Sequence, residues 1–177
     1  MPKTTERAFE LSLSGQRAPV AYERAPTYPG MIAEKDVMVP MRDGVKIAVD
    51  IYRPDTTEKL PALLAFSIHN KDIQGPELAQ ASLTQPAWSM LWTGPAEAGD
   101  TKFFVSRGYV HVIGNPRGIG KSEAGGSRAF DGYDLIEWIA AQPWCDGNVG
   151  MVGISGPTDP SLRPARKPPE NGPPPVP

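Results

Sequence analysis

The sequence predicts an α/β fold with a mixed, mostly parallel sheet that opens on an antiparallel hairpin. Three observations support this expectation. Two alternating apolar segments flank an Asp43-Gly44 turn, two nearly continuous apolar runs have the length of buried strands, and a strand-helix-strand pattern follows in residues 109–154. The chain has 177 residues, 40% of them hydrophobic, which fits one domain and leaves little room for a second.

The first half of the domain is expected to be a hairpin followed by a buried strand. Residues 37–39 and 45–52 alternate in apolar character around the turn, and Asp-Gly is a strong short-range signal for an antiparallel pair. Residues 60–68 are nearly all apolar, as expected for a strand covered on both faces. Residues 72–101 contain scattered glycine, proline and tryptophan, and their pattern predicts nothing more regular than short helical turns.

The second half is expected to hold a short helix, a strand and a longer helix. The short helix is expected around residues 101–106, and the β-branched and aromatic residues 109–113 predict a buried strand. Asp131 is the expected N-cap of a helix that runs to about Gln142 and is stopped by the following proline. A loop at residues 144–148 then returns the chain to the sheet.

A single serine follows the last expected strand, residues 149–154, and lies close to two glycines. A serine on a tight strand-to-helix turn is how one class of hydrolase presents a nucleophile, because the turn exposes the hydroxyl oxygen. Ser155 is therefore the candidate nucleophile, and the backbone N–H of Gly156 is the candidate donor to the developing oxyanion. Taken alone, a glycine-x-serine-glycine segment is also found as an ordinary turn after a strand.

Composition and charge exclude several classes of function as working hypotheses. A net charge of −2 and a pI near 5.7 predict binding to neither nucleic acid nor an anionic membrane. Residues 1–30 contain no apolar stretch like that of a secretion signal, so a cytoplasmic protein is expected. The one cysteine, Cys145, can form no internal disulfide, and with His69 and His111 as the only histidines the sequence predicts no metal site and no cofactor.

Residues 118–122 read Gly-Ile-Gly-Lys-Ser after an expected strand, which is similar to a phosphate-binding loop. That motif needs a glycine five residues before its second glycine, and Asn115 occupies that position. Pro116 also removes a backbone donor that would otherwise face a phosphate. Nucleotide binding is therefore not expected.

Several motifs, taken in their order along the chain, resemble a known family of enzymes. The motifs are Met-Arg-Asp-Gly at 41–44, Arg-Gly-Tyr at 107–109, Pro-Arg-Gly-Ile-Gly-Lys-Ser-Glu at 116–123, Asp-Gly-Tyr-Asp at 131–134 with Trp138, Gln-Pro-Trp at 142–144 and Gly-Ile-Ser at 153–155. Over residues 34–156 the chain resembles the Xaa-Pro dipeptidyl-peptidase and cocaine-esterase family of serine hydrolases. The resemblance implies the N-terminal half of an α/β-hydrolase with a Ser-Asp-His triad, which cleaves small-molecule esters or amides, or peptides, through an acyl-enzyme.

The resemblance also implies roles for individual positions. Ser155 matches the family nucleophile, and the family's second oxyanion donor is usually a tyrosine in a segment similar to Ser-Pro-Tyr-Asn-Lys. His69 occupies that tyrosine position here, which makes it a candidate oxyanion donor, with a solvated loop histidine as the alternative. His69 is not expected to be the triad base, because aspartate and histidine follow the serine in this fold.

Two more polar residues belong to the strand at 109–113 or to the loop after it. His111 lies within the strand pattern, so it is expected to be packed and hydrogen-bonded rather than catalytic. Asn115 stands where the family often has aspartate, in a loop that is expected to shape the fold near the site.

The chain changes character directly after the candidate nucleophile. Nine of the 21 residues in 157–177 are proline, which predicts a disordered tail. Pro160 and Pro164 would interrupt the helix that normally follows the serine, since an interior proline costs about 3 kcal/mol. No histidine follows Ser155, and Asp159 is the only aspartate after it. We therefore expect a truncated, alternatively spliced or frame-shifted product whose hydrolase activity is absent or impaired.

Three segments and two classes of function follow from these observations. Residues 1–33 are expected to be an irregular N-terminal arm, 34–156 a partial α/β-hydrolase domain, and 157–177 the proline-rich tail. The chain is expected to be a serine hydrolase by descent or, alternatively, a non-catalytic fragment whose tail binds a partner as polyproline II. Without the next strand of the family sheet, the strand before Ser155 becomes an edge, and self-association through this edge is expected.

Overall fold

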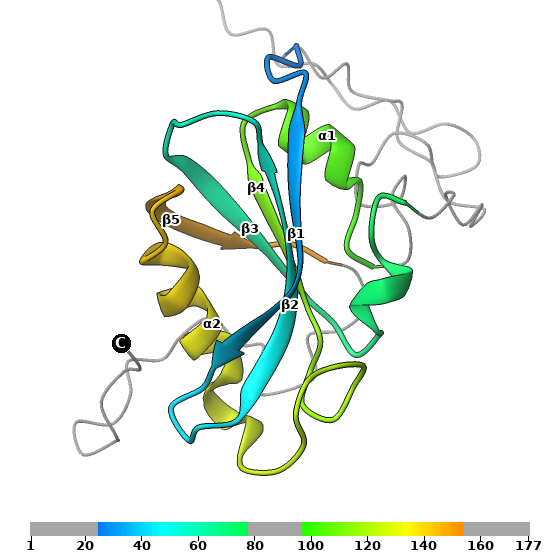
Figure 1. The fold of residues 1–177 in the computed structure, drawn as a ribbon, viewed down its shortest axis with the longest axis vertical. Helices are drawn as coiled ribbons and strands as arrows, with labels where there is room; N and C mark the ends of the chain where they lie inside the picture. Colours follow the sequence, from blue (N-terminus) through cyan, green and yellow to red (C-terminus); the bar gives the residue numbers. More distant parts are fainter. Residues whose placement is uncertain (1–24, 78–96, 154–177) are drawn as a thin grey trace, which may run out of the picture.

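The computed structural model describes residues 25–77 and 97–153, which form one sheet with helices on both faces (Figure 1). The strands are β1 (Met31–Pro40), β2 (Lys46–Pro54), β3 (Leu60–Phe66), β4 (Val110–Gly114) and β5 (Cys145–Met151). The helices are α1 (Thr101–Ser106) and α2 (Asp131–Ala140), with short 3₁₀ turns η1 (Lys71–Ile73) and η2 (Arg128–Phe130). The expected tail and most of the expected N-terminal arm lie outside the described residues.

The five strands lie in the order β1-β2-β4-β3-β5. β2 pairs antiparallel with both β1 and β4, whereas β3 pairs parallel with both β4 and β5. The predicted α/β class, mixed sheet and N-terminal hairpin are therefore confirmed. The sheet is less parallel than expected, because β2 uses both of its edges for antiparallel partners.

The hairpin is longer than the alternation of its residues indicates. β1 begins at Met31, ahead of the expected start of order near Glu34, and its register with β2 shifts between Glu34 and Val37. Asp36, inside this bulge, has a φ of +57°. A β-bulge inserts an extra residue into one strand and turns its side chain out of the regular alternation. That irregularity interrupts the pattern which would have marked the first part of β1 as a strand.

The last strand starts earlier than predicted. Residues 144–148 were expected to form a loop, but β5 begins at Cys145, which is buried and pairs with Leu60. The register then shifts, so that Val149 pairs with Ala62. The polar residues 146–148 lie within this register shift, where Gly147 has a φ of +92°. Exposed polar residues inside a bulge carry the sequence signature of a loop, which explains the difference.

Helix α2 begins at Asp131, as expected, but Asp131 does not cap it. The N-cap position is Phe130, and no side chain accepts a hydrogen bond there. The Asp131 carboxylate instead accepts hydrogen bonds from the Arg117 guanidinium, at 2.7 to 2.9 Å. The predicted capping role is therefore wrong, because a buried arginine from a distant loop is the stronger partner.

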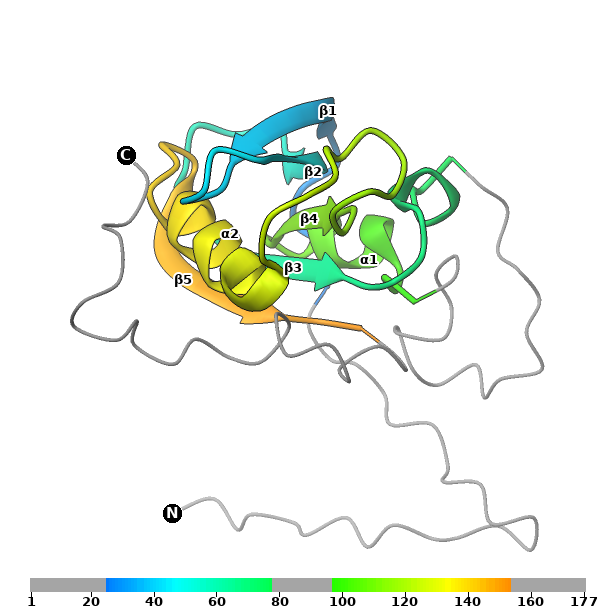
Figure 2. The same ribbon diagram turned by 90° about the horizontal axis from the view of Figure 1, so that it is seen from below.

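Two hydrophobic clusters fill the two faces of the sheet. The larger cluster lies between the sheet and α2, where Leu135 and Ile139 meet alternate residues of β2, β3 and β4. The smaller cluster contains Val105 of α1 together with Tyr52 and Ile113 from the opposite face. Figure 2 shows α1 and α2 on opposite sides of the sheet, which is the layering of an α/β fold. No helix within 25–77 or 97–153 has the length and apolar character needed to cross a membrane.

Candidate active site

The carboxyl ends of β3 and β5 lie side by side at one edge of the sheet. β3 and β5 are parallel neighbours, and the Val152 N–H donates to the Leu64 carbonyl at 3.0 Å, which continues the pairing past the end of β5. In open α/β sheets, ligands bind outside the carboxyl ends of the strands. The described chain stops at Gly153, so Ser155 and Gly156 lie outside the described residues. Their roles as nucleophile and oxyanion donor stay predictions.

His69 lies in the loop that leaves β3 at this same edge. Its main chain is held on both sides, since Ser67 Oγ accepts from the His69 N–H at 3.3 Å and Gln74 Nε2 donates to the His69 carbonyl at 3.0 Å. The side chain is 46% exposed, and its Nε2 lies 3.4 Å from Glu97 Oε1. The imidazole is therefore neither a free surface group nor a packed core residue.

Glu97 contacts both the loop after β3, at His69, and the end of β5, at Gly153. Its side chain faces His69, and its carbonyl oxygen lies next to the end of β5, because a Cβ added to Gly153 would be 3.7 Å from it. Glu97 Oε2 is buried and has no hydrogen-bond partner among the described residues. Glu97 could not be found from the sequence, because it falls within the region 72–101, where no periodicity or motif marks any residue.

Lys71 anchors the His69 loop to the first two strands. Its side chain is 1% exposed, and Nζ lies 2.7 to 2.9 Å from carboxylate oxygens of Asp36, Asp50 and Asp72. Burial alone would lower the pKa of Lys71, but the hydrogen bonds that its ammonium group donates to these three carboxylates outweigh burial and raise the pKa. Hydrogen bonds from Lys121 and then from Lys71 lower the pKa of Asp36 to about 2. The position of the loop is thus fixed by a charged and fully buried ammonium group.

The Lys71 main chain joins the loop to the next one along the edge. Its N–H donates to Asn115 Oδ1 at 2.5 Å, and the Asn115 N–H donates to the Ala48 carbonyl at 3.0 Å. Through its hydrogen bond with Lys71, the fully buried Asn115 joins the loop after β3 to the loop after β4. This contact supports the expectation that the Asn115 loop shapes the fold near the site.

The motif residues of the sequence form a buried set of ion pairs, which we call the arginine cluster. It consists of Arg42, Asp43, Arg117, Asp131 and Asp134. Arg42 bonds Asp134 with Nη2 at 2.5 Å and Nε at 2.9 Å, and Arg117 bridges Asp43 and Asp131 at 2.7 Å each. Hydrogen bonds donated to Asp131 and Asp43 raise the pKa of Arg117, despite its burial. The cluster joins the hairpin turn, the loop after β4 and α2.

The second histidine is a packed residue, as predicted. His111 is fully buried in β4, and its Nδ1 lies 2.9 Å from Thr101 Oγ1 of α1. Burial lowers the pKa of His111 to about 3, with a backbone hydrogen bond at Ala98 acting weakly in the opposite direction. The imidazole is therefore neutral at physiological pH and closed to substrate.

The glycine-rich segment after β4 is used internally. Lys121 Nζ pairs with Asp36, and Ser122 Oγ accepts from the Ala48 N–H and donates to the Asn115 carbonyl, at 2.9 and 2.8 Å. The lysine and hydroxyl that a phosphate loop would need are thus engaged within the fold. Within the described ranges, no three His, Cys, Asp or Glu side chains are grouped so as to hold a metal ion.

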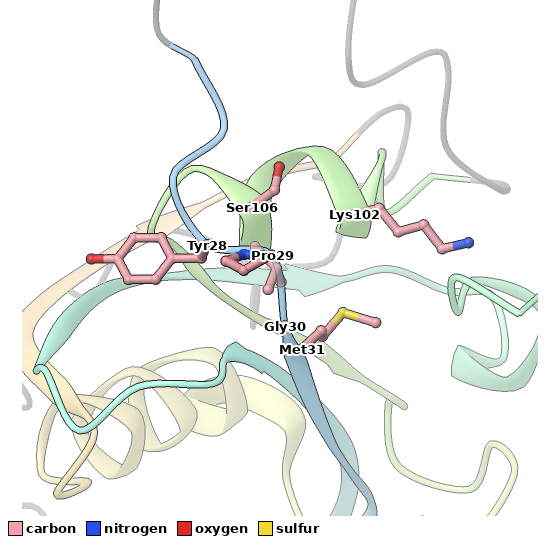
Figure 3. A pocket seen from close by; sticks show the side chains of 7 residues that line it. Tyr28, Pro29, Gly30, Met31, Lys102 and Ser106 are labelled. Carbon is pink, nitrogen blue, oxygen red and sulfur yellow. The ribbon is translucent and has the colours of Figure 1, made fainter.

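A hollow of about 280 Å³ lies at the other end of the sheet. It is lined by residues 28–31 and by three residues of α1, among them Lys102 and Ser106 (Figure 3). Met31 pairs with Pro54 at the far end of β2, which lies beyond the start of β4. The hollow therefore opens at the amino ends of the parallel strands, away from His69 and Glu97.

The family model for X-Pro dipeptidyl-peptidases (S15 family) matches residues 43–159. The chain belongs to this family. Its sequence is also 41% identical over 125 residues to the cocaine esterase of a Rhodococcus species, a match that covers 68% of this chain and 19% of the esterase. The resemblance inferred from the motifs is therefore confirmed.

Solved structures agree on the fold. The chain is similar to a CocE/NonD family hydrolase from Staphylococcus aureus, with 38% identity, a TM-score of 0.56, and coverage of 70% of this chain and 23% of that one. It is also similar to an α-amino acid ester hydrolase, with 26% identity, a TM-score of 0.52, and coverage of 76% and 22%. The chain spans about a fifth to a quarter of the length of these relatives. Its sheet thus aligns with part of an α/β-hydrolase.

Proposed function

We propose that the carboxyl edge of β3 and β5 carries the nucleophile of a serine hydrolase whose activity is impaired in this chain, with Ser155 attacking the carbonyl carbon of an ester, an amide or an Xaa-Pro peptide bond. One observation supports this most strongly. The pairing of Val152 with Leu64 continues β5 beside the end of β3, and so leads the segment before Ser155 toward the loop that holds His69. Family membership supports the same role.

The proposed chemistry is acyl transfer in two steps. The Ser155 oxygen forms a bond to the carbonyl carbon, its proton goes to a base, and the carbonyl oxygen becomes an oxyanion that the Gly156 N–H stabilises. Collapse of this intermediate expels the alcohol or amine, which takes up the proton, and leaves an acyl-serine. Water then adds to the acyl carbon in the same way and releases the acid.

Ester and peptide bonds are the substrate class that the relatives' names support. The family is described as X-Pro dipeptidyl-peptidase, and the relative with 41% identity is named a cocaine esterase. Both reactions pass through the attack of a nucleophile on an acyl carbon, so one arrangement of serine and oxyanion donor serves either.

Reaction with a fluorophosphonate tests this proposal directly. The folded chain is incubated with the reagent, and the adduct is located by peptide mass spectrometry. We expect the adduct on Ser155, its loss in Ser155→Ala, and no change in Ser161→Ala, which removes a serine from the proline-rich segment instead. An adduct on another serine, or no adduct at all, would rule out Ser155 as an activated nucleophile.

We also propose that the chain self-associates through β5. Among the described residues, β5 pairs with β3 alone, and most of its side chains are exposed. An unpaired strand edge offers a row of N–H and C=O groups to another chain. Light scattering coupled to size exclusion should show a mass that rises with concentration, and less so for Met151→Lys. A monomer at every concentration would contradict this.

A further inference from the structure

We propose that acid releases α1 from the sheet while the strands stay paired, because a proton on His111 of β4 cannot be accommodated beneath the helix. This device lies within the described residues and is independent of Ser155. Three features support it. The imidazole is enclosed, it is hydrogen-bonded to the first residue of α1, and little else holds this short helix in place.

His111 lies in the middle of the sheet, on the face that α1 covers. β4 is paired on both sides, with Tyr52 of β2 and Leu63 of β3 opposite His111. The imidazole is fully buried, and the Phe104 ring of α1 lies edge-on to it, with ring centroids 5.3 Å apart. A charged ring at this position would lose its water of hydration, which is costly unless an opposite charge replaces it.

Within residues 25–77 and 97–153, no acidic side chain is placed to compensate a proton on His111. The titratable groups on the elements around His111 are engaged elsewhere: Tyr52 with Lys35, Asp50 with Lys35 and Lys71, Glu97 with His69, and Asp100 with the Phe103 N–H. Lys102 of α1 lines the hollow. Burial therefore lowers the pKa of His111 from 6.5 to about 3, and the Ala98 main chain offsets only part of this effect.

The contact between His111 and α1 is specific to the neutral ring. Nδ1 lies 2.9 Å from Oγ1 of Thr101, the first residue of the helix, which is 1% exposed. A hydroxyl can donate to a neutral ring nitrogen or accept from it, whereas both nitrogens of an imidazolium are donors. Protonation would therefore place a charged N–H at Nε2, which is buried and has no hydrogen-bond partner among the described residues.

α1 has few other contacts to hold it. It is six residues long, and only Thr101 and Val105 are buried. Helices of this length are not stable without packing. The Ser106 carbonyl accepts hydrogen bonds from the N–H groups of Thr27 and Tyr28, at 2.8 and 3.0 Å. The hollow of Figure 3 lies between this stretch and α1, so release of the helix would also open the hollow.

The pH window follows from the two states of the ring. In the released form the imidazole is in water and has its ordinary pKa of 6.5, whereas in the closed form its pKa is about 3. The closed form is therefore fully favoured above pH 6.5 and loses this advantage as pH falls below that value, by about tenfold for each pH unit. Between pH 7.5 and pH 5 the released fraction should rise about 30-fold.

Hydrogen exchange of the full chain measures this opening segment by segment. Protection factors for residues 101–106 and 110–114 are compared between pH 7.5 and pH 5, after correction for intrinsic exchange at each pH. We expect α1 to be less protected than β4 throughout, and its protection to fall about 30-fold at pH 5. Equal protection of α1 and β4 would mean that the whole domain opens at once, and protection of α1 that does not change with pH would exclude His111 as the trigger. Either result overturns the inference.

Replacing each of the two histidines by glutamine assigns the effect. His111→Gln keeps a hydrogen-bonding side chain that cannot take up a proton, so exchange of α1 should lose its pH dependence. His69→Gln is the matched control, because this half-exposed histidine has no contact with α1 among those found. It should keep the 30-fold change expected of wild type. A pH dependence that persists in His111→Gln, or that disappears in His69→Gln, would contradict the assignment.

NMR of the wild-type imidazoles serves if His111→Gln does not fold. His69→Gln identifies the signals of His111, which should keep their neutral positions from pH 7.5 to pH 5. Titration of His111 with a midpoint near pH 6.5 would show that the closed fold admits the proton, and would overturn the inference. Thr101→Val removes the hydroxyl alone and should speed exchange of α1 at pH 7.5 by about 3- to 10-fold. Unchanged exchange would show that this hydrogen bond does not hold the helix.

Discussion

The arginine cluster and the His69–Glu97 pair are both built from charged side chains, but they differ in how fully their carboxylates are bonded. Each aspartate of the cluster accepts hydrogen bonds from an arginine, and these contacts are largely buried. Glu97 has one oxygen facing a half-exposed histidine and the other buried without a described partner. The aspartates of the cluster therefore hold elements together through both of their oxygens, although Arg42 Nη1 is also buried without a partner among the described residues.

The difference predicts that the two regions respond to mutation in opposite ways. Changes in the arginine cluster should lower stability, since they leave a buried charge without its partner. Changes in the half-exposed His69–Glu97 pair should leave stability nearly intact.

The largest expected loss of stability comes from Asp134→Ala. It leaves the guanidinium of Arg42, whose side chain is 6% exposed, without a carboxylate. We expect the free energy of unfolding, from urea titration, to fall by about 3 to 5 kcal/mol. Glu34→Ala removes the partly exposed pair with Arg53 and should cost less than about 1 kcal/mol. Equal losses in the two variants would show that the cluster does not hold the fold.

The next effect concerns two adjacent glycines with positive φ. A Cβ on Gly126 would lie 2.2 Å from Asp43 Oδ2 and 2.6 Å from Arg117 Nη1, whereas a Cβ on Gly125 would meet nothing within 4 Å. Both alanine variants are strained, by about 1 to 2 kcal/mol. Gly126→Ala should lose a further 1 kcal/mol or so by forcing the ion pair apart. Thermal melting compares the two, and identical melting temperatures would contradict this account.

Acid should weaken the Lys71 anchor. The pKa of Asp36 is about 2 in the folded chain, below its ordinary value of 3.8, so its stabilisation is present above pH 4 and is lost as pH falls toward 2. The urea midpoint should drop in this window, and by less in Asp36→Asn. Asp55→Asn makes the same charge change at an exposed residue outside the anchor and should keep the full drop. An equally steep drop of the urea midpoint in Asp36→Asn and in wild type would show that Asp36 is not the group responsible.

The smallest expected effect on stability is that of His69→Gln and Glu97→Gln. The imidazole is 46% exposed, and pairs of this kind contribute about 0 to 1 kcal/mol. Both variants should therefore unfold within about 1 kcal/mol of the wild-type chain by urea titration. A loss as large as that of Asp134→Ala would mean that the pair is part of the framework.

The strands and helices could be predicted where periodicity and burial agree. The hairpin, the buried run at 60–68, the strand before residue 114 and the helix after Asp131 all follow from alternation or helical spacing. The two bulges could not be predicted, because Asp36 and Gly147 interrupt the alternation that marks a strand. A break in the alternation of apolar residues normally indicates the end of a strand.

The candidate site was predictable only in part, for a different reason. His69 could be found from its place in a motif, whereas Glu97 has no local signal and matters only through a contact 28 positions away in the chain. The residues of the arginine cluster were all present in the motifs, yet their pairing depends on tertiary distance. Asp131 is an example: local sequence rules predict that it caps α2, but its carboxylate accepts hydrogen bonds from Arg117 instead.

The most direct test of the central claim is the rate at which a fluorophosphonate modifies Ser155 in the folded chain, compared with the same chain unfolded in urea. If the carboxyl edge activates the serine, the folded chain should react about 100-fold faster. Equal rates in the folded and unfolded chains would contradict the account.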